Sequence, residues 1–389
     1  MKLVPLSYSF RSLWVRRSAT LLTVFSIGAT VAMLASVLAL QQGFETLYTE
    51  TGREDVHILM RPGSTSEGLA AFPRSTVNIL LKNLDEVAVD DKGRPLAAAE
   101  SFLAVRLNKL GGAGETNVPI RGVQPRSFDL AASSWKLVDG RRFDPGTDQV
   151  IVGRKLVERI EHCRIGEVLE VNTTPFEVVG IFDGDGPESS EIWGDVERIM
   201  NALERSAFNR VIVKLKPGTD IEAFRDRMAV HAQQPATVQT EREYLAGQSG
   251  LISALLLLIA GILGFVMGLA AVFTSVNTML SALVARTKEV GILLSIGYRP
   301  AAVFLAFMFE ATLLGLVGGL IGCVLAIPVN GIETGTSNMQ TFTEVAFAFK
   351  LSPGVLGTAV IFAVALGLVG GAWPALKASR LKPTDALRR

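Results

Sequence analysis

The chain has 389 residues, of which 49% are hydrophobic and 19% are charged, and its formal net charge is +1. This is rich in apolar residues and poor in charge for a soluble chain of this length. The balanced charge provides no basic surplus, so we expect no nucleic-acid partner. The two cysteines, Cys163 and Cys323, fall in different predicted regions and are not expected to pair.

Four apolar stretches are long enough to cross a bilayer, for which a helix needs about 20 residues. Residues 18–44, 244–285 and 351–376 carry no charge, and residues 300–328 carry only Glu310. We therefore predict membrane spans over residues 18–42, 244–284, 301–328 and 352–373. The second stretch is too long for one crossing but contains no turn signal. It is predicted to be one long helix that projects beyond the bilayer at its N-terminal side.

Lysine and arginine residues near the span ends indicate the orientation. They cluster in residues 1–17, 285–300 and 374–389, which we therefore place in the cytoplasm. Residues 43–243 and 329–351 would then lie outside. A cleaved signal peptide at the N-terminus is the alternative, but the first apolar run is long and no clear cleavage site follows it. An uncleaved anchor is the better interpretation.

The segment 43–243 is predicted to be an α+β domain, so the fold class is an α-helical membrane protein with four spans and a large extracytoplasmic α+β domain between spans one and two. Runs rich in β-branched residues predict strands over Val56–Met60, Val118–Val123, Val150–Gly153, Val168–Val171, Phe176–Phe182 and Arg210–Leu215. Helical spacing occurs over Arg74–Leu84, Arg154–Cys163 and Asp220–Ala232. Pro119 predicts an edge position for its strand, and residues 97–136 suggest a division into two lobes.

The domain shows little chemistry. The chain has no G-x-x-x-x-G-K-[ST] phosphate loop, no H-E-x-x-H, no C-x-x-C and no G-x-S-x-G, so we predict no enzyme activity and no metal or cofactor bound by this chain. Asp183, Asp185 and Glu188 could offer oxygen ligands to Ca²⁺. The other spaced ligands of such a site are missing, and a solvated turn is the favoured interpretation.

Small residues recur at four-residue spacing in the later spans, which allows close approach of helix backbones in lipid. The residues concerned are Gly264, Gly268, Gly315, Gly319 and Gly322, with Gly318, Gly367 and Gly371 in the same pattern. They predict helix packing within the chain or a seam between two copies. Glu310, inside span three, is a candidate functional acid, or a hydrogen-bonded helix contact.

The loop between spans two and three, residues 285–300, reads ARTKEVGILLSIGYRP. Val290, Leu293, Leu294 and Ile296 have helical spacing, and Gly297 can end the helix. Such an amphipathic helix can lie in the membrane surface or dock on a partner.

This loop and the span after it resemble a known family. The stretch from Lys288 to Tyr298, followed by Phe307, Glu310 and the glycines of span three, resembles the signature of FtsX-like permeases of the MacB type, the membrane subunits of type VII ABC systems. Residues 17–44 resemble the family's first span. LVDGRRF at residues 137–143 and FEVVGIF at 176–182 resemble its outer domain, and residues 374–388 resemble its C-terminal tail. Leu294 stands where many members carry a basic residue.

The resemblance implies a permease that works with a separate, dimeric cytoplasmic ATPase, which would bind the ATP and Mg²⁺. It implies that residues 285–300 form the coupling helix, with contacts from Arg286, Lys288, Glu289, Gly291, Leu293, Gly297 and Tyr298. It also implies a second permease copy, a bacterial inner-membrane location, and a periplasmic adaptor or outer-membrane protein as a candidate partner. The function implied is mechanotransmission for export or extraction of an amphiphilic client such as a lipoprotein, peptide, drug or lipid.

Two other functions remain open from the sequence. The chain could be a non-transporting regulator or scaffold that controls an outer partner such as a cell-wall hydrolase. It could also be a secondary transporter driven through Glu310, although four spans without ion-coordinating breaks fit that class poorly.

Overall fold

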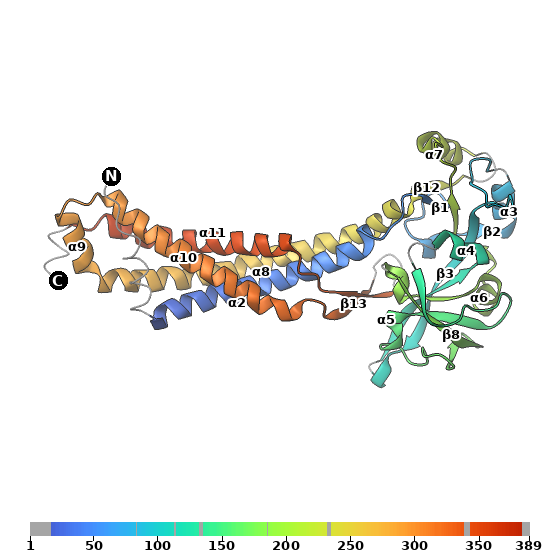
Figure 1. The fold of residues 1–389 in the computed structure, drawn as a ribbon, viewed down its shortest axis with the longest axis horizontal. Coiled ribbons are helices and arrows are strands. Elements are labelled where there is room, and N and C mark those ends of the chain that lie inside the picture. The colour runs from blue at the N-terminus through green and yellow to red at the C-terminus, as the bar shows by residue number, and fades with distance from the viewer. Residues whose placement is uncertain are drawn as a thin grey trace. The chain divides into compact units, whose positions relative to one another are not determined.

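The structure is a computed structural model that describes residues 17–82, 84–112, 114–131, 135–184, 186–231, 235–337 and 343–382. The chain divides into two compact units (Figure 1). One, the membrane unit, comprises Met1–Gly43, Ala254–Ile332 and Ala348–Arg389. The other, the inserted domain, comprises Phe44–Ser253 and Glu333–Phe347.

The membrane unit is helical. Its elements are α2 (Arg17–Thr49), α8 (Glu241–Ala285), α9 (Thr287–Ser295), α10 (Pro300–Ala326), the short turn η4 (Ile327–Val329) and α11 (Pro353–Ser379). Within the described residues, α2, α8, α10 and α11 are long and apolar enough to cross a membrane. The first turns of α8 and the last of α2 belong to the inserted domain.

The helix α8 is continuous over 45 residues, which corresponds to about 67 Å, roughly twice the thickness of the hydrocarbon core. The helix α11 continues through Pro374 to Ser379, beyond the predicted end of span four at residue 373. Proline inside a helix removes one backbone hydrogen bond. The last turns nevertheless stay helical because Ala375 and Ala378 are buried against α8 and α10.

The inserted domain is built on one sheet whose order is β12-β1-β11-β3-β4-β9-β6-β8-β5, with β7 also paired to β8. The strands are β1 (Val56–Met60), β3 (Ala97–Asn108), β4 (Glu115–Val123), β5 (Trp135–Gly140), β6 (Gln149–Gly153), β7 (Val168–Val171), β8 (Thr174–Gly184), β9 (Ile192–Asp195), β11 (Arg210–Lys214) and β12 (Thr237–Thr240). Two small ladders pair β2 (Phe72–Pro73) with β10 (Ala207–Phe208) and β13 (Glu333–Ser337) with β14 (Glu344–Ala348). The helices are α3 (Arg74–Lys82), α4 (Pro125–Ala131), α5 (Arg154–Val157), α6 (Val196–Ala202) and α7 (Ile221–Ala229), and the 3-10 turns are η1 (Glu67–Leu69), η2 (Leu110–Gly112) and η3 (Pro187–Ser190).

The long strand β3 joins the two halves of this sheet. Its residues 97–100 pair with β11, and its residues 101–108 pair with β4. The half that contains β11 has a hydrophobic core with α3 and α7, and the half that contains β4 has a second core around β6 and β8. The two halves of one continuous sheet thus pack against separate hydrophobic clusters.

Two local predictions in this domain were wrong. The strand that contains Pro119 is not at a sheet edge, because β4 lies between β3 and β9. Its pairing with β9 begins only at Ile120, so the proline occupies the part of β4 that has one neighbour. The helix predicted over Arg154–Cys163 ends at Val157, and His162 has a positive φ of 60° that a helix cannot contain.

Candidate coupling segment and buried charge network

The segment that follows α8 forms the short helix α9, which ends in a C-terminal cap. Arg286 occupies the N-terminal cap position. At the other end, Gly297 has a φ of 94°, the N–H of Tyr298 donates to the carbonyl of Leu293, and the N–H of Gly297 donates to the carbonyl of Leu294. This is the Schellman arrangement, in which a residue with positive φ satisfies the last carbonyls of a helix.

One face of α9 is anchored in the membrane unit. Val290 is buried and Leu294 packs against the same cluster, which includes Met279 and Leu283 of α8 and Phe307 of α10. Gly291 is also buried.

The opposite face of α9 is exposed. Lys288 and Glu289 are exposed, and the side chains of Ile292 and Ile296 are 48% and 70% exposed. Leu293 is only half-buried, so Ile292 and Ile296 supply most of the exposed apolar surface. The sequence prediction placed Leu293 in this role and did not include Ile292. The helix is therefore amphipathic, and Ile292 and Ile296 are the apolar pair at its surface.

Arg286 and Glu310 form a buried ion pair. Nη1 of Arg286 lies 3.0 Å and 3.2 Å from the two carboxylate oxygens of Glu310, and the two side chains are only 8% and 6% exposed. The guanidinium also lies 3.4 Å from Glu289 and 5.7 Å from the centre of the Phe307 ring. Arg286 is therefore turned toward α10, and Glu310 has the basic partner that a carboxylate in this position requires.

The predicted small-residue positions lie against helices of the same chain. A Cβ atom on Gly315 would lie 2.6 Å from the carbonyl oxygen of Ala363, and one on Gly322 would lie 2.6 Å from that of Gly28. Gly319 faces Ala363, whereas Gly264 and Gly268 face side chains of α2 and α11. The close approaches of α10 to α2 and α11 thus require glycine, as small residues at lipid-buried interfaces generally allow.

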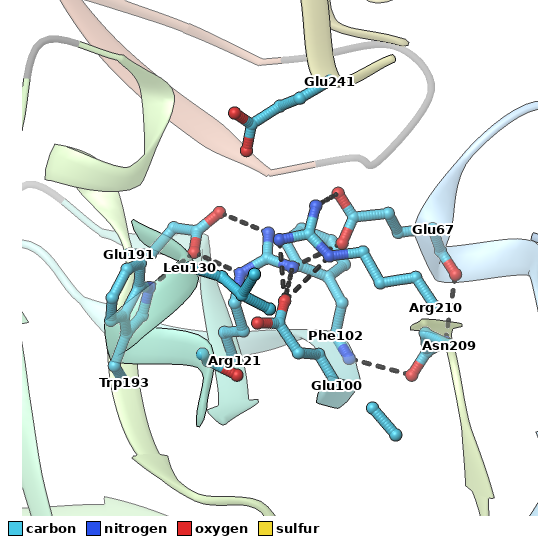
Figure 2. Close-up of polar contacts among 12 residues, drawn as sticks. Glu67, Glu100, Phe102, Arg121, Leu130, Glu191, Trp193, Asn209, Arg210 and Glu241 are labelled. Atoms are coloured by element: carbon cyan, nitrogen blue, oxygen red, sulfur yellow. Dashed lines mark hydrogen bonds and ion pairs between the residues drawn. The ribbon is translucent and has the colours of Figure 1, made fainter. Parts of the chain in front are cut away.

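The inserted domain contains a network of buried charges (Figure 2). Arg121 of β4 donates to Glu191 through two nitrogens and to Glu67 and Glu100 through a third. Arg210 of β11 binds Glu67 at 3.0 Å and Glu100 at 2.8 Å. Burial opposes the charge on Arg121, but Glu191 and Glu67 outweigh it and raise the pKa of Arg121. Burial likewise opposes the charge on Glu67, yet the two arginines lower its pKa.

A second ion pair lies beside this network. Nε and Nη2 of Arg53 bind the two oxygens of Glu241, at 2.5 Å and 2.8 Å. Next to it, Arg242 pairs with Glu54, and the N–H of Arg242 donates to the carbonyl of Arg53. The backbones touch here, because a Cβ on Gly52 would lie 2.3 Å from the Cα of Arg242. We call this contact between residues 52–54 and 241–242 the clamp.

The β13–β14 ladder binds to the rest of the domain through Glu344. Its carboxylate accepts from Arg159, from Lys109 at 2.7 Å and from Thr116 at 2.6 Å. Burial would raise the pKa of Glu344, but Lys109, Thr116 and Arg159 together lower it. The N–H of Ala346 donates to the hydroxyl of Ser190, which adds a second attachment.

The structure corrects the prediction of a solvated acidic turn near residue 185. Asp183 lies near Arg154 at 3.5 Å, and Asp185 lies outside the described residues. Glu188 is partly buried and lines a cavity that Arg53, Arg121 and Glu241 also line. No local pattern could have shown this, because the groups around Glu188 come from strands and helices far away in the sequence.

Comparison with known proteins agrees with this architecture. Residues 19–230 match the MacB-like periplasmic core domain, and residues 261–383 match the FtsX-like permease C-terminal domain. The chain belongs to the MacB/FtsX-like permease family of ABC transporters, as its sequence predicted. It is a membrane protein of four apolar helices with an α+β domain inserted after the first, which confirms the predicted fold class.

Particular relatives are named as transport proteins. The chain is 28% identical over 416 residues to the pyoverdine export ATP-binding/permease protein PvdT of Pseudomonas fluorescens, and 26% identical over 412 residues to that of Pseudomonas aeruginosa. Each match covers 97% of this chain and 58% of the relative, so the chain spans little more than half the length of these proteins.

Among solved structures, the extracellular domain of the transporter YknZ from Gram-positive bacteria is 16% identical. It matches 48% of this chain and 99% of its own, with a TM-score of 0.36. The periplasmic region of MacB from Actinobacillus actinomycetemcomitans is 13% identical. It matches 50% of this chain and 92% of its own, with a TM-score of 0.37.

Proposed function

We propose that this chain is a permease subunit that transmits ATP-driven motion from a separate cytoplasmic ATPase to its inserted domain. The observation that carries the proposal is α9, whose one face is anchored by Val290 and the Arg286–Glu310 pair while the other exposes Ile292 and Ile296. An anchored helix with a free apolar surface can receive force from a bound partner and pass it to α8 and α10. Family membership supports the same role.

The proposal also covers the client that is transported and the proteins that assemble with this chain. The relatives carry export in their names, which favours export of an amphiphilic client over regulation of a cell-wall hydrolase. We place the chain in the bacterial inner membrane with residues 285–300 and both chain ends on the cytoplasmic side, because these segments are basic. A second permease copy, a dimeric ATPase that binds ATP and Mg²⁺, and an outer adaptor complete the assembly.

The ion pair of Glu310 argues against the alternative of a proton-driven secondary transporter. A carboxylate that carries protons across a membrane needs access to water. Glu310 instead binds Arg286 at 3.0 Å, and both side chains are almost completely buried. We therefore assign Glu310 an anchoring role.

The coupling role of α9 is tested by Ile292→Asp. A carboxylate in the centre of an apolar contact is expected to cost about 2 kcal/mol or more, which weakens binding of the ATPase about 30-fold. Full-length chain would be purified from its native membrane into lipid nanodiscs. The co-purifying ATP-binding protein would then be isolated, and its affinity for each variant measured.

Ile292→Leu is the matched control and should bind like the unaltered chain, because it keeps an apolar side chain of the same size at this surface position. The chain without its partner should hydrolyse no ATP. If Ile292→Asp binds the ATPase as tightly as Ile292→Leu does, or if the isolated chain hydrolyses ATP, the proposal is wrong.

A further inference from the structure

The buried charges of the inserted domain surround a cavity of about 70 Å³. This is enough space for a few water molecules. The charged residues that line the cavity are the arginines Arg53, Arg121 and Arg210 and the glutamates Glu67, Glu100, Glu188, Glu191 and Glu241. The wall of the cavity therefore carries more carboxylates than guanidinium groups.

Four of these glutamates have an arginine partner. Glu67, Glu100 and Glu191 bind Arg121, and the first two also bind Arg210. Glu241 binds Arg53. All three arginines are thus committed to other carboxylates, and Glu188 has no basic partner among the residues that the structure describes.

The carboxylate of Glu188 is in a place that disfavours its charge. It folds back over Gly186, whose N–H donates to it at 3.2 Å, and a Cβ on Gly186 would lie 2.3 Å from this carboxylate. Burial raises the pKa of Glu188 to about 7, and the negative charges of Glu241 and Glu191 act in the same direction. A carboxyl group in a partly buried place without a cation is expected to keep its proton to a higher pH than an exposed one.

The cavity adjoins the clamp. Arg53 and Glu241, whose ion pair belongs to the clamp, both line it, and so do Thr51 and Leu245 on either side of them in the sequence. Thr343 and Val345 of the segment between α10 and α11 line it as well. A new negative charge on Glu188 would repel Glu241 and so weaken its hold on Arg53.

We propose that this cavity is a proton-binding site, that Glu188 carries its exchangeable proton, and that loss of the proton opens the clamp between residues 52–54 and 241–242. The groups that face Glu188 fit this role. Arg121 and Arg210 are both held by Glu100 on β3 and Glu67 on η1, and Arg121 is also held by Glu191 between η3 and β9. Glu191 is fixed further by the indole N–H of Trp193 at 2.7 Å. The Arg53–Glu241 pair is the contact that a charge on Glu188 can disturb most directly.

The size of the effect follows from proton linkage. The closed clamp binds the extra proton between the ordinary pKa of 4.5 and the raised value of about 7, so acid favours closure and the advantage is lost as the pH rises through about 7. If water reaches Glu188 in the open clamp and restores its ordinary pKa, the opening equilibrium rises about tenfold from pH 6 to pH 8. Above the raised pKa it changes no further.

Hydrogen exchange of the full-length chain in lipid nanodiscs tests this inference. Backbone protection in residues 51–55 and 241–245, corrected for the intrinsic exchange rate at each pH, is expected to fall about tenfold between pH 6 and pH 8. In Glu188→Gln, which mimics the protonated carboxyl group, it should stay at the acidic level throughout. No ATP or ATPase is present, so the outcome is independent of the proposed transport function.

Two further variants keep the test decisive. Glu170→Gln removes an exposed carboxylate on β7 and should retain the pH dependence of the unaltered chain. Glu188→Asp keeps a titratable group and should also retain it. Unchanged protection in β6 and β8 verifies that each variant is folded. The proposal is overturned if the clamp of the unaltered chain shows no pH dependence, or if Glu188→Gln shows the same dependence.

Discussion

The buried pair of Arg286 and Glu310 shows that the structural role of a charged residue depends on its partner. A lone carboxylate in a membrane helix suggests a functional acid, and an arginine in a cytoplasmic loop suggests a surface contact. The structure joins the two at 3.0 Å in a place where both are buried. The pair therefore fixes the start of α9 to α10, and the exposed apolar side chains of α9 lie on its other face.

This anchoring role predicts that losing one partner is worse than losing both. Glu310→Ala leaves the guanidinium of Arg286 buried without its main counter-charge, which is expected to cost about 3 kcal/mol and to raise hydrogen exchange in residues 287–295 about 100-fold. In the double variant Arg286→Met/Glu310→Met no charge is left unpaired, and exchange should return toward the original level. A double variant that exchanges as fast as Glu310→Ala would contradict the anchoring role.

Contacts between charged side chains that are far apart in the sequence could not be predicted from the sequence. The sequence offered Glu310 as a candidate functional acid or a hydrogen-bonded helix contact, but nothing local shows that Arg286 lies beside it. Glu188 was read as part of a solvated turn because Gly and Asp surround it. Its actual neighbours come from β4, β11 and α8, and only the fold brings them together.

At the scale of elements, local residue patterns predicted the bounds of a strand correctly where residue type and flanking turn residues agreed. The strands β1 and β7 have the predicted bounds because they contain β-branched residues and turn residues flank them. The strand β3 was missed because it begins with three alanines, which are poor strand formers. Its pairing on both sides stabilises it. Tertiary pairing likewise places β4 inside the sheet in spite of Pro119.

The close approach of α10 to α11 gives a prediction for this scale. In Gly315→Ala the new methyl group would lie 2.6 Å from the carbonyl oxygen of Ala363, so the helices must separate, and the chain should lose about 2 kcal/mol of stability. Gly357→Ala is the matched control, because nothing lies within 4 Å of its Cβ position. It should be neutral or raise stability by up to about 1 kcal/mol through helix propensity.

The midpoint of thermal unfolding in detergent micelles, measured for both variants in parallel, separates these outcomes. Gly315→Ala should unfold at a lower temperature than Gly357→Ala. Equal midpoints would show that α10 and α11 can separate at Gly315 without cost.

At the scale of the whole molecule, the fold class was predictable because membrane spans depend on composition along a continuous stretch. The order of strands was not, since it depends on contacts between distant segments. The same holds for the segment between α10 and α11. From the sequence it is an acidic loop, whereas in the structure Glu344 binds Arg159, Lys109 and Thr116 and attaches the segment to the inserted domain.

The attachment of Glu344 gives a prediction for the proposed complex of this chain with its ATPase. The clamp holds the residues after α2 and the start of α8, and the attachment of Glu344 holds the segment between α10 and α11. All four spans therefore continue in sequence into segments bound within the inserted domain.

In Glu344→Gln the ion pairs to Arg159 and Lys109 are lost, which should cost about 2 kcal/mol and raise hydrogen exchange in residues 343–347 about 30-fold. The rate of ATP hydrolysis by the proposed complex with an ATPase should stay within about twofold of that of the unaltered complex, because α9 is unaltered. Addition of ATP should, however, change hydrogen exchange in the inserted domain less than it does in the unaltered complex. Glu333→Gln, an exposed change in β13, is the control and should keep the full response. If ATP alters exchange in the Glu344→Gln complex as strongly as in the control, the α10–α11 segment takes no part in the proposed transmission of motion.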